Sequence, residues 1–270
     1  MKRICQYLGL SRSGYYASCK DRSRAEMSES IAVDLVQEVR RKLPRIGGKK
    51  LYFMLQKDLQ EAGKIGRDKF FDVLKKHGLL VKRKKSYTKT THSFHRFYTY
   101  KNLLKEKEIT HPDECYVADI TYIRTDGGFV YLFLLTDYYS RKIVGWSLSK
   151  SLSIEGGLES LRMALKQNRH REEIIHHSDR GIQYCSKDYV SFLEKNGIKS
   201  SMTEENHCYE NSKAERVNGI LKDEFLLDST FKNFAEAYKA TAEAVRLYNE
   251  IRPHWALKLK TPNMVHRLAS

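Results

Sequence analysis

The sequence predicts an α/β protein, in which a mixed five-stranded sheet with helices is preceded by an all-helical, strongly basic region. Helical spacing of apolar residues dominates the first 80 positions, whereas short β-rich runs alternate with amphipathic stretches after residue 115. The positive charge is equally uneven, since residues 1–100 hold 24 Lys and Arg against 9 Asp and Glu, and residues 101–270 hold 25 against 24. We divide the chain into a helical basic region (1–80), a basic aromatic linker (81–110), an α/β core (111–228) and a C-terminal helix with its tail (229–270).

Composition narrows the class of protein. With 270 residues, 41% of them hydrophobic, the chain is long and apolar enough to build a real core. We expect no membrane span and no signal peptide, because no apolar run approaches about 18 residues. The five scattered cysteines form no CxxC pair. This pattern favours a reducing cytoplasm and argues against a disulfide framework or a four-ligand zinc site.

Helices account for the basic region. The pattern predicts a short helix, a turn at Gly9, a second helix capped by Ser11 or Ser13, and further helices over 28–43, 49–60 and 67–77, the last ended by Gly78. The last two helices are joined by a glycine-containing turn and resemble a helix-turn-helix DNA reader, although a plain basic helical bundle fits the same pattern. The second of them carries four candidate DNA-binding residues: Arg67, Lys69, Lys75 and Lys76.

The linker is basic and rich in Tyr and Phe. It contributes four more candidate DNA-binding residues: Lys82, Arg83, Lys84 and Lys85. We expect this segment to lie extended along phosphates, with aromatic side chains that either stack on bases or pack on the next domain. The net charge of +16 indicates a polyanionic partner, most simply nucleic acid, while a solubilising surface or attraction to ribosomes or membranes remains the alternative.

Strands and helices alternate in the core. Three β-rich runs over 115–125, 128–140 and 141–149 predict an antiparallel meander, because only short turns separate them. A helix (153–169), a short strand (173–178), a helix (187–197), a strand (198–202) and a long helix (211–226) follow. This order is that of a ribonuclease-H-like fold. One more helix closes the chain, and Pro253 and Pro262 fix the tail beyond it.

Two acidic residues, Asp119 and Asp179, lie at positions where a buried carboxylate would be unfavourable. Asp119 interrupts an apolar strand that we expect to be central, and Asp179 ends the fourth strand in "HHSDRGIQY". In the predicted topology these two strands are neighbours, so the two carboxylates would lie close together. Because like charges repel, a bound divalent cation is the natural remedy, and oxygen ligands favour Mg²⁺ or Mn²⁺ over zinc.

Glu215 is the third candidate acid. It belongs to a polar stripe on the long helix, shared with Asn211, Asn218 and Lys222, and such a stripe is commonly a solvated face. The interval favours a functional role instead. Thirty-five residues separate Asp179 from Glu215, enough for one helix and one strand.

These motifs together resemble a known family. "YVADITY", "HSDRGIQY" and "CYENSKAERVNGILKDE", with "LGLSRSGYY" near the start and "YNEIRPHWALKLKTP" near the end, are similar to motifs of the DDE transposases of bacterial insertion sequences. The resemblance is to the second-reading-frame product of the IS-three family, whose core is shared with retroviral integrases. Tyr116, Glu210 and Trp255 depart from the usual Trp, Asp and Ser of that family.

The resemblance implies a metal-dependent polynucleotidyl transferase. Asp119, Asp179 and Glu215 would be both catalytic residues and metal ligands, holding two Mg²⁺ or Mn²⁺ ions per active site with Asp119 bridging them. The partners would be double-stranded DNA at transposon ends and target, and further copies of the chain on that DNA. An upstream-frame segment is a possible fusion partner. The location implied is the bacterial cytoplasm, on the nucleoid when DNA is bound.

Side chains beside the acids offer further DNA contacts. Lys222 is placed to reach a phosphate of the transposon end, although an ordinary surface lysine fits as well, and Arg180 follows Asp179 directly. For the whole chain, the alternative functions are a non-catalytic DNA-binding regulator or decayed transposase, and a stand-alone nuclease. The three acids argue against the first, and the basic arm with the C-terminal tail argues against the second.

Overall fold

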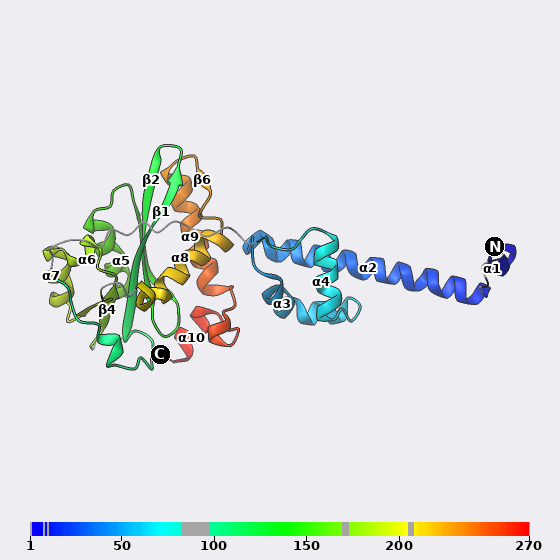
Figure 1. Cartoon of the computed structure of the whole chain (residues 1–270), viewed down its shortest axis with the longest axis horizontal. Coiled ribbons are helices and arrows are strands. Elements are labelled where there is room, and N and C mark those ends of the chain that lie inside the picture. The colour runs from blue at the N-terminus through cyan, green and yellow to red at the C-terminus, as the bar shows by residue number, and fades with distance from the viewer. Residues whose placement is uncertain are drawn as a thin grey trace. The chain divides into compact units, whose positions relative to one another are not determined.

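A computed structural model describes residues 2–7, 9, 11–82, 98–168, 173–204 and 208–269. The chain divides into two compact units, residues 1–84 and 85–270. The first unit is helical and the second contains the sheet (Figure 1).

Four helices build the first unit. They are α1 (Lys2–Tyr7), α2 (Arg12–Lys42), α3 (Gly48–Glu61) and α4 (Arg67–Lys76). Ser11 caps α2 by accepting a hydrogen bond from the Gly14 backbone N–H at 2.9 Å. Where the sequence predicts two helical stretches, α2 runs unbroken for 31 residues. The reason is that neither Gly nor Pro interrupts the chain between Gly14 and Pro44.

The second half of α2 packs with α3 and α4 around a small apolar core. Its fully buried members include Ala32, Leu51, Leu59, Phe70 and Leu74. Helix α4 ends as expected before Gly78, which adopts the left-handed conformation at φ +64° that glycine tolerates best. Both predicted helices, α3 and α4, are present and are joined by a turn that contains Gly63 and Gly66.

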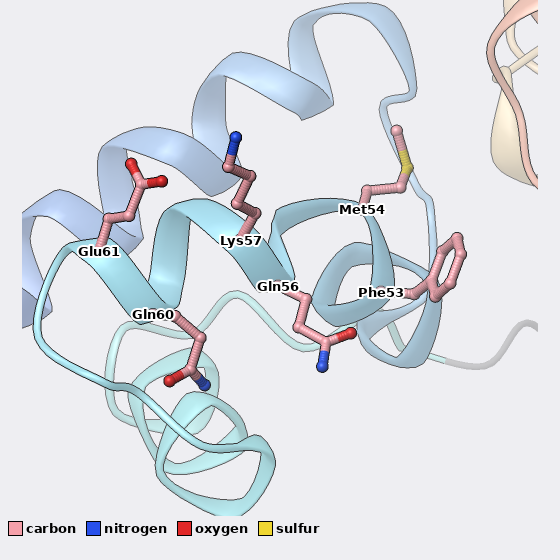
Figure 2. Close-up of a pocket in the computed structure, with 6 residues that line it drawn as sticks. All are labelled: Phe53, Met54, Gln56, Lys57, Gln60 and Glu61. Carbon is pink, nitrogen blue, oxygen red and sulfur yellow. The ribbon is translucent and has the colours of Figure 1, made fainter.

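A shallow pocket lies on the outer face of α3 (Figure 2). Its lining comes from a single helix and consists of Phe53, Met54, Gln56, Lys57, Gln60 and Glu61. None of the three predicted catalytic acids contributes to it, because all of them belong to the second unit.

A six-stranded sheet forms the centre of the second unit. The strands are β1 (Cys115–Thr125), β2 (Gly128–Asp137), β3 (Ile143–Ser149), β4 (Ile175–Ser178), β5 (Lys199–Met202) and β6 (Thr230–Phe231). The order β3-β2-β1-β4-β5 confirms the predicted meander and the predicted neighbours β1 and β4. The two-residue strand β6, which pairs in parallel with the end of β1, was not expected.

Helices cover the sheet (Figure 1). They are α5 (Ile154–Gln167), α6 (Ile182–Cys185), α7 (Lys187–Lys195), α8 (Ser212–Glu224), α9 (Phe234–Glu250) and α10 (Pro262–Leu268), with short 3-10 turns at Leu103–Lys105, Cys208–Asn211 and Trp255–Leu257. The expected helices on either side of β5 are confirmed. The single turn α6 has no counterpart among the expected elements, because four residues are too few to show a helical period.

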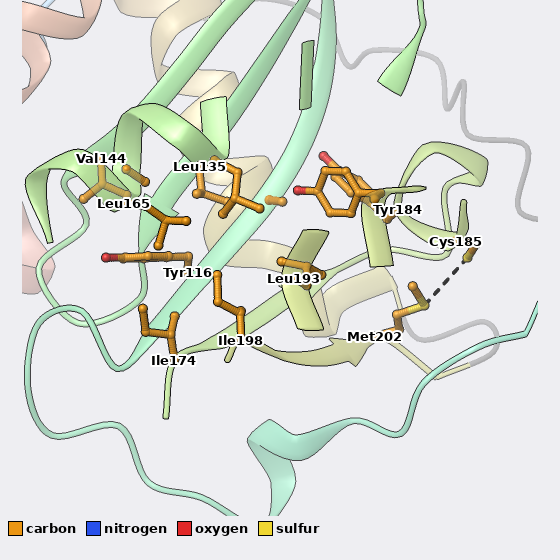
Figure 3. Packing of buried hydrophobic residues seen from close by; sticks show 14 residues of the cluster. Tyr116, Leu135, Val144, Leu165, Ile174, Tyr184, Cys185, Leu193, Ile198 and Met202 are labelled. Atoms are coloured by element: carbon orange, nitrogen blue, oxygen red, sulfur yellow. Dashed lines mark hydrogen bonds between the residues drawn. The ribbon is translucent and has the colours of Figure 1, made fainter. Parts of the chain in front are cut away.

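The apolar core lies between the sheet and its helices (Figure 3). Tyr116, Leu161 and Ile174 are completely buried in it, and Tyr100 from the chain ahead of β1 packs against it. The Leu103 backbone N–H also donates to the Ser201 hydroxyl at 3.0 Å. Of the two roles expected for the linker aromatics, Tyr100 therefore takes the packing role.

A buried ion pair ties the C-terminal region to α8. The guanidinium of Arg252, 2% exposed, donates to both carboxylate oxygens of Glu224 at 2.6 and 2.7 Å. Arg252 also lies against the Tyr248 ring, 5.9 Å from its centroid. The "RPH" motif thus has a structural role, in holding the helix that carries Glu215.

We expect Arg252→Gln to destabilise the second unit strongly. The substitution removes the guanidinium charge that Arg252 places against the Glu224 carboxylate in a largely buried place, and breaking a buried ion pair typically costs about 3–5 kcal/mol. Urea unfolding followed by circular dichroism would measure it. Arg246→Gln is the matched control, because Arg246 pairs with Glu243 and Glu250 on the exposed face of α9 and such pairs contribute at most about 1 kcal/mol. Equal losses in the two variants would contradict the prediction.

Candidate active site

The sheet opens on one edge of β1. Strand β4 pairs with residues 115–117 of β1, and β6 pairs with residues 124–125. Since β2 occupies the other edge along nearly the whole strand, the backbone between these two partners is left without a strand beside it. Asp119 lies in this opening.

Both oxygens of Asp119 are engaged. Oδ1 accepts a hydrogen bond from the Ile120 N–H at 2.9 Å, and Oδ2 accepts one from the Asn218 side-chain amide at 2.7 Å. The side chain is half-buried. It is therefore held in one orientation by its own strand and by α8.

Asp179 follows β4 directly. In the parallel register Val117 lies opposite His177, and Asp179 comes two residues later, near enough for its charge to act on Asp119. The Gly181 N–H donates to Asp179 Oδ1 at 3.0 Å. A Cβ on residue 181 would lie only 3.0 Å from that same oxygen, which explains why glycine suits this turn.

Glu215 lies in the first turn of α8 and is exposed. The helix is anchored on β1 by Asn218 and by the Asn211 side-chain amide, which donates to the Ala118 carbonyl at 3.0 Å. Asn211 and Asn218 are 2% and 6% exposed, so these two members of the polar stripe are buried, whereas Glu215 is exposed. The two amides turn toward the strand that carries Asp119.

The three acids share one electrostatic environment. The pKa of Asp119 is raised to about 7 by burial first and by the charge of Asp179 second, with Glu215 adding a smaller rise. The hydrogen bonds from Asn218 and Ile120 act in the opposite direction, because they favour the charged carboxylate. The charges of Asp179 and Glu215 thus act on Asp119, although the three acids do not all bring ligand atoms within 4.8 Å of one another.

We expect the stability of the metal-free protein to report this raised pKa. Between the ordinary value of 3.8 and about 7, the native state holds a proton that the unfolded chain has lost. The free energy of unfolding therefore falls as the pH rises through that window. Asn cannot titrate, so the gain in melting temperature of Asp119→Asn over wild type, measured in EDTA, should be larger at pH 8 than at pH 5. An equal gain at both values would show that Asp119 has an ordinary pKa.

A second group of ligating side chains lies elsewhere in the unit. Within the part of the chain that the structure describes, only Asp113, Asp137 and His266 bring three ligand atoms within 4.8 Å of one another. Asp137 already accepts hydrogen bonds from the Asp113 N–H and from the N–H and hydroxyl of Ser140, at 2.6–2.8 Å. The Tyr116 hydroxyl donates to Asp113 at 2.7 Å. These contacts already satisfy the two carboxylates, and the group joins α10 to the sheet.

Comparisons with known proteins agree with this architecture. Two models described as integrase core domain match residues 109–208 and 196–262. The insertion element IS600 uncharacterized 31 kDa protein of Shigella sonnei is 35% identical over 258 residues, covering 93% of each chain. Transposase InsF for insertion sequence IS3A of Escherichia coli (strain K12) is 31% identical over 231 residues, covering 83% of this chain and 78% of the relative. The chain belongs to the IS3 family of insertion-sequence transposases.

A solved structure supports the fold of the transposase. The chain resembles one in the cryo-electron microscopy structure of a simian T-cell lymphotropic virus intasome in complex with the PP2A regulatory subunit B56 gamma. The TM-score is 0.50 at 18% identity, with 82% of this chain and 74% of that chain covered. The predicted ribonuclease-H-like core is confirmed at the level of the fold.

Two histidines beside Asp179 are structural. His176 Nε2 lies 2.9 Å from the Tyr189 hydroxyl, and His177 Nδ1 lies 2.9 Å from the Ser201 hydroxyl. Burial lowers the pKa of His176 to about 3 and that of His177 to about 4. Both rings are therefore neutral at physiological pH, and they position β4 rather than carry charge to the site.

The two predicted DNA contacts beside the acids differ in their surroundings. Arg180 Nε donates to the Thr203 carbonyl at 2.9 Å, which fixes the side chain against the end of β5. Lys222 Nζ lies 4.2 Å from the centroid of the Tyr122 ring, and burial lowers its pKa while the charge of Asp119 opposes that shift. Lys222 is thus half-buried beside the acids and not an ordinary surface lysine.

The candidates in the basic region are exposed. On α4, Lys69 and Lys75 are exposed, Arg67 contacts Asp68 at 3.0 Å and Lys76 contacts Glu29 at 2.6 Å. Lys82 is exposed as well. Arg83, Lys84 and Lys85 lie outside the described residues. Among the described helices, none is long and apolar enough to cross a membrane.

The departures from the family motifs leave the acids untouched. Tyr116 is completely buried, and its hydroxyl receives a hydrogen bond from Asn168 at 2.9 Å as well as donating to Asp113. Glu210 accepts a hydrogen bond from the Glu204 N–H and faces Lys105 at 3.4 Å. Trp255 is 57% exposed. The first two serve packing and ion pairing.

Sequence reasoning missed Asn211 and Asn218 as site residues. Their shared stripe with Glu215 was visible, but an amide at helical spacing does not tell whether it faces water or a strand. Only the packing of α8 on β1 shows that these amides face the strand. That packing depends on contacts from Asn211 to Ala118 and from Asn218 to Asp119, which are 93 and 99 positions apart in the chain.

Proposed function

We propose that the transposase is a metal-dependent DDE polynucleotidyl transferase that cleaves the DNA ends of its element and joins them to a target. Asp119, Asp179 and Glu215 are its catalytic residues. The observation that carries the proposal is the placement of Asp119 and Asp179 on and directly after neighbouring strands, with α8, which carries Glu215, bonded to Asp119 through Asn218, in a chain of the IS3 family. Three carboxylates placed there would attract a cation, although the chain has a net charge of +16.

The residues present fit a hard divalent cation. All three side chains offer carboxylate oxygens, the ligands that Mg²⁺ and Mn²⁺ prefer, and the raised pKa of Asp119 reflects burial first and repulsion from Asp179 second, both of which a bound cation would offset. Asp119 would hold both of two ions, with Asp179 and Glu215 holding one each. Bound there, such ions activate the attacking oxygen and stabilise the leaving oxygen in a displacement at phosphorus.

The remaining side chains position the acids. Asn218 and the Ile120 N–H orient the Asp119 carboxylate, and the Gly181 N–H orients that of Asp179. This mechanism needs no Ser or Cys nucleophile, because the attacking group is first water and then the freed 3′-hydroxyl of the DNA. The protein's part is to align the scissile phosphate with fixed carboxylates.

DNA and further copies of the chain are the proposed partners. The basic region binds double-stranded DNA at element ends and target, and joining two ends to one target requires more than one active site. The similar viral chain was solved in an intasome. We also propose that fusion to an upstream-frame segment completes end recognition in the bacterial cytoplasm, where the protein associates with the nucleoid.

One assay distinguishes a transposase from a stand-alone nuclease and from a non-catalytic DNA-binding protein. The transposase is incubated with a labelled duplex carrying the element's terminal sequence and a plasmid target, in Mg²⁺, in Mn²⁺ and in EDTA. We expect cleaved ends and joined products that both disappear in EDTA. Cleavage without joining would indicate a nuclease, and binding without cleavage, with or without the upstream segment, would indicate a regulator or decayed transposase.

A further inference from the structure

Two aromatic rings are exposed on the hairpin of β1 and β2. Tyr122 is 38% exposed and Phe129 is 49% exposed. The rings contact each other edge to face, with centroids 5.2 Å apart. The two adjacent rings therefore form a small exposed aromatic surface on which a planar group could stack.

Cations flank both rings. Lys222 Nζ lies 4.2 Å from the Tyr122 centroid, and the Arg124 guanidinium lies 5.6 Å from the Phe129 centroid. The four side chains form a continuous strip in the order Lys222, Tyr122, Phe129 and Arg124. Alternating cations and exposed rings match a nucleic-acid strand, in which phosphates alternate with bases.

The strip begins at the candidate active site. Lys222 lies close enough to Asp119 for that carboxylate to act on its charge. Along β1, Tyr122 is three residues from Asp119 and Arg124 is five, and Phe129 lies directly opposite Arg124. At about 3.3 Å per residue, Tyr122 and Arg124 lie about 10 and 17 Å along the strand from Asp119, on the opposite face of the sheet, and Lys222 of α8 reaches Tyr122 there. At a rise of about 3.4 Å per nucleotide, the strip therefore lies about three or more nucleotides from the scissile phosphate.

The hairpin is held firmly. The Thr125 hydroxyl donates to the Gly128 carbonyl at 2.8 Å across the turn, and the Asp126 N–H donates to the Phe231 carbonyl at 2.9 Å. Strand β6 pairs with β1 at the same level. Because the rings are presented on a braced hairpin, they form a preorganised surface.

We propose that this strip binds one strand of the DNA end beside the cleavage site, with an unpaired base stacked on Phe129 and Tyr122 and phosphates bound by Arg124 and Lys222. A base within an intact duplex is covered by its neighbours, so an exposed ring can stack only on a base that has left the helix. The strip thus opens the last few base pairs and presents the scissile phosphate to the acids. This inference rests on the proposed function, because it identifies the DNA that the same site uses.

The test reports base stacking separately from cleavage. Duplexes carrying the element's terminal sequence hold the fluorescent base 2-aminopurine at the third, fourth or fifth nucleotide from the cleavage site, either paired or opposite a mismatch. The full-length chain in its Asp119→Asn form is added in Mg²⁺. We expect quenching of the probe for at least one of these positions, and stronger binding to the mismatched duplex than to the paired one.

Two variants and one control locate the stacking surface. In the same background, Phe129→Leu and Tyr122→Leu keep an apolar side chain and should abolish the quenching. Each should also weaken binding of the mismatched duplex by about five- to 150-fold, the range expected for one stacked base. Tyr238→Leu is the matched control, since Tyr238 is 47% exposed on α9, and it should leave the quenching unchanged. Melting curves confirm that each variant is folded.

The outcomes separate the two proposals. Quenching that persists in both Phe129→Leu and Tyr122→Leu, or that is absent at all three positions, would overturn the stacking surface even if the wild type cleaves and joins DNA. Loss of quenching in these variants would support it, even if the wild type proved unable to cleave. In that case the strip would remain a DNA-binding surface, and the proposed catalytic function would be wrong.

Discussion

Asp119→Asn should abolish DNA cleavage and strand transfer while leaving the transposase folded and bound to DNA. Asn has the size of Asp but lacks the charge that would hold two cations together. Losing several kcal/mol of transition-state stabilisation corresponds to a rate loss of about 10²- to 10³-fold or more. The fold should survive, because the raised pKa shows that the charged carboxylate is unfavourable in the empty protein. End cleavage in Mg²⁺, measured at equal DNA occupancy, gives the rates.

Two further substitutions sharpen this experiment. Asp188→Asn is the matched control on the exposed face of α7 and should cleave at the wild-type rate. Asp137→Asn removes a charge from the Asp113–Asp137–His266 group and should lower the melting temperature, while the folded protein still binds Mn²⁺ at the acids. If Asp119→Asn cleaved as fast as wild type, the carboxylate would be structural and the proposed active site would be wrong.

Removing the basic region should greatly weaken DNA binding. The fragment 98–270 keeps 25 Lys and Arg against 24 Asp and Glu, so its net charge is +1 instead of +16. It begins at residue 98 because Tyr100 and Leu103 belong to the second unit. Between 50 and 200 mM salt, a chain that neutralises six or more phosphates loses about 10³-fold or more in affinity, whereas the fragment should bind weakly with a shallow salt dependence.

Substitutions in the intact chain check the same point without truncation. Lys69→Gln with Lys75→Gln, on the exposed face of α4, should weaken binding and reduce the salt slope by about 2. Lys187→Gln with Lys239→Gln removes the same charge from exposed positions of the second unit and should have little effect. If fragment 98–270 bound DNA as tightly as the whole chain, the basic region would not be the source of affinity.

Local pattern in the sequence was sufficient for the order of most elements and for singling out Asp119 and Asp179, whereas Glu215 was favoured by its interval from Asp179 and by the family resemblance. Alternation and helical spacing are properties of neighbouring residues, so the strands of the meander and α8 follow from them. The pairing of β1 with β4 was expected from the ribonuclease-H-like order of elements. A carboxylate within an apolar strand stands out for the same reason, because its burial has a cost that the surrounding residues make visible. Asp119 and Asp179 could therefore be singled out before any contact was known.

Long-range packing decided the rest. The bond from Asn218 to Asp119 joins residues 99 positions apart, and that from Arg252 to Glu224 joins α8 to the C-terminal region. Strand β6 is two residues long, and only its position beside β1 makes it a strand. The pairing of Tyr122 with Phe129 depends on the register of a hairpin. Which side chains meet is set by how whole elements pack, and the free energy of that packing is not encoded in any short stretch of the chain.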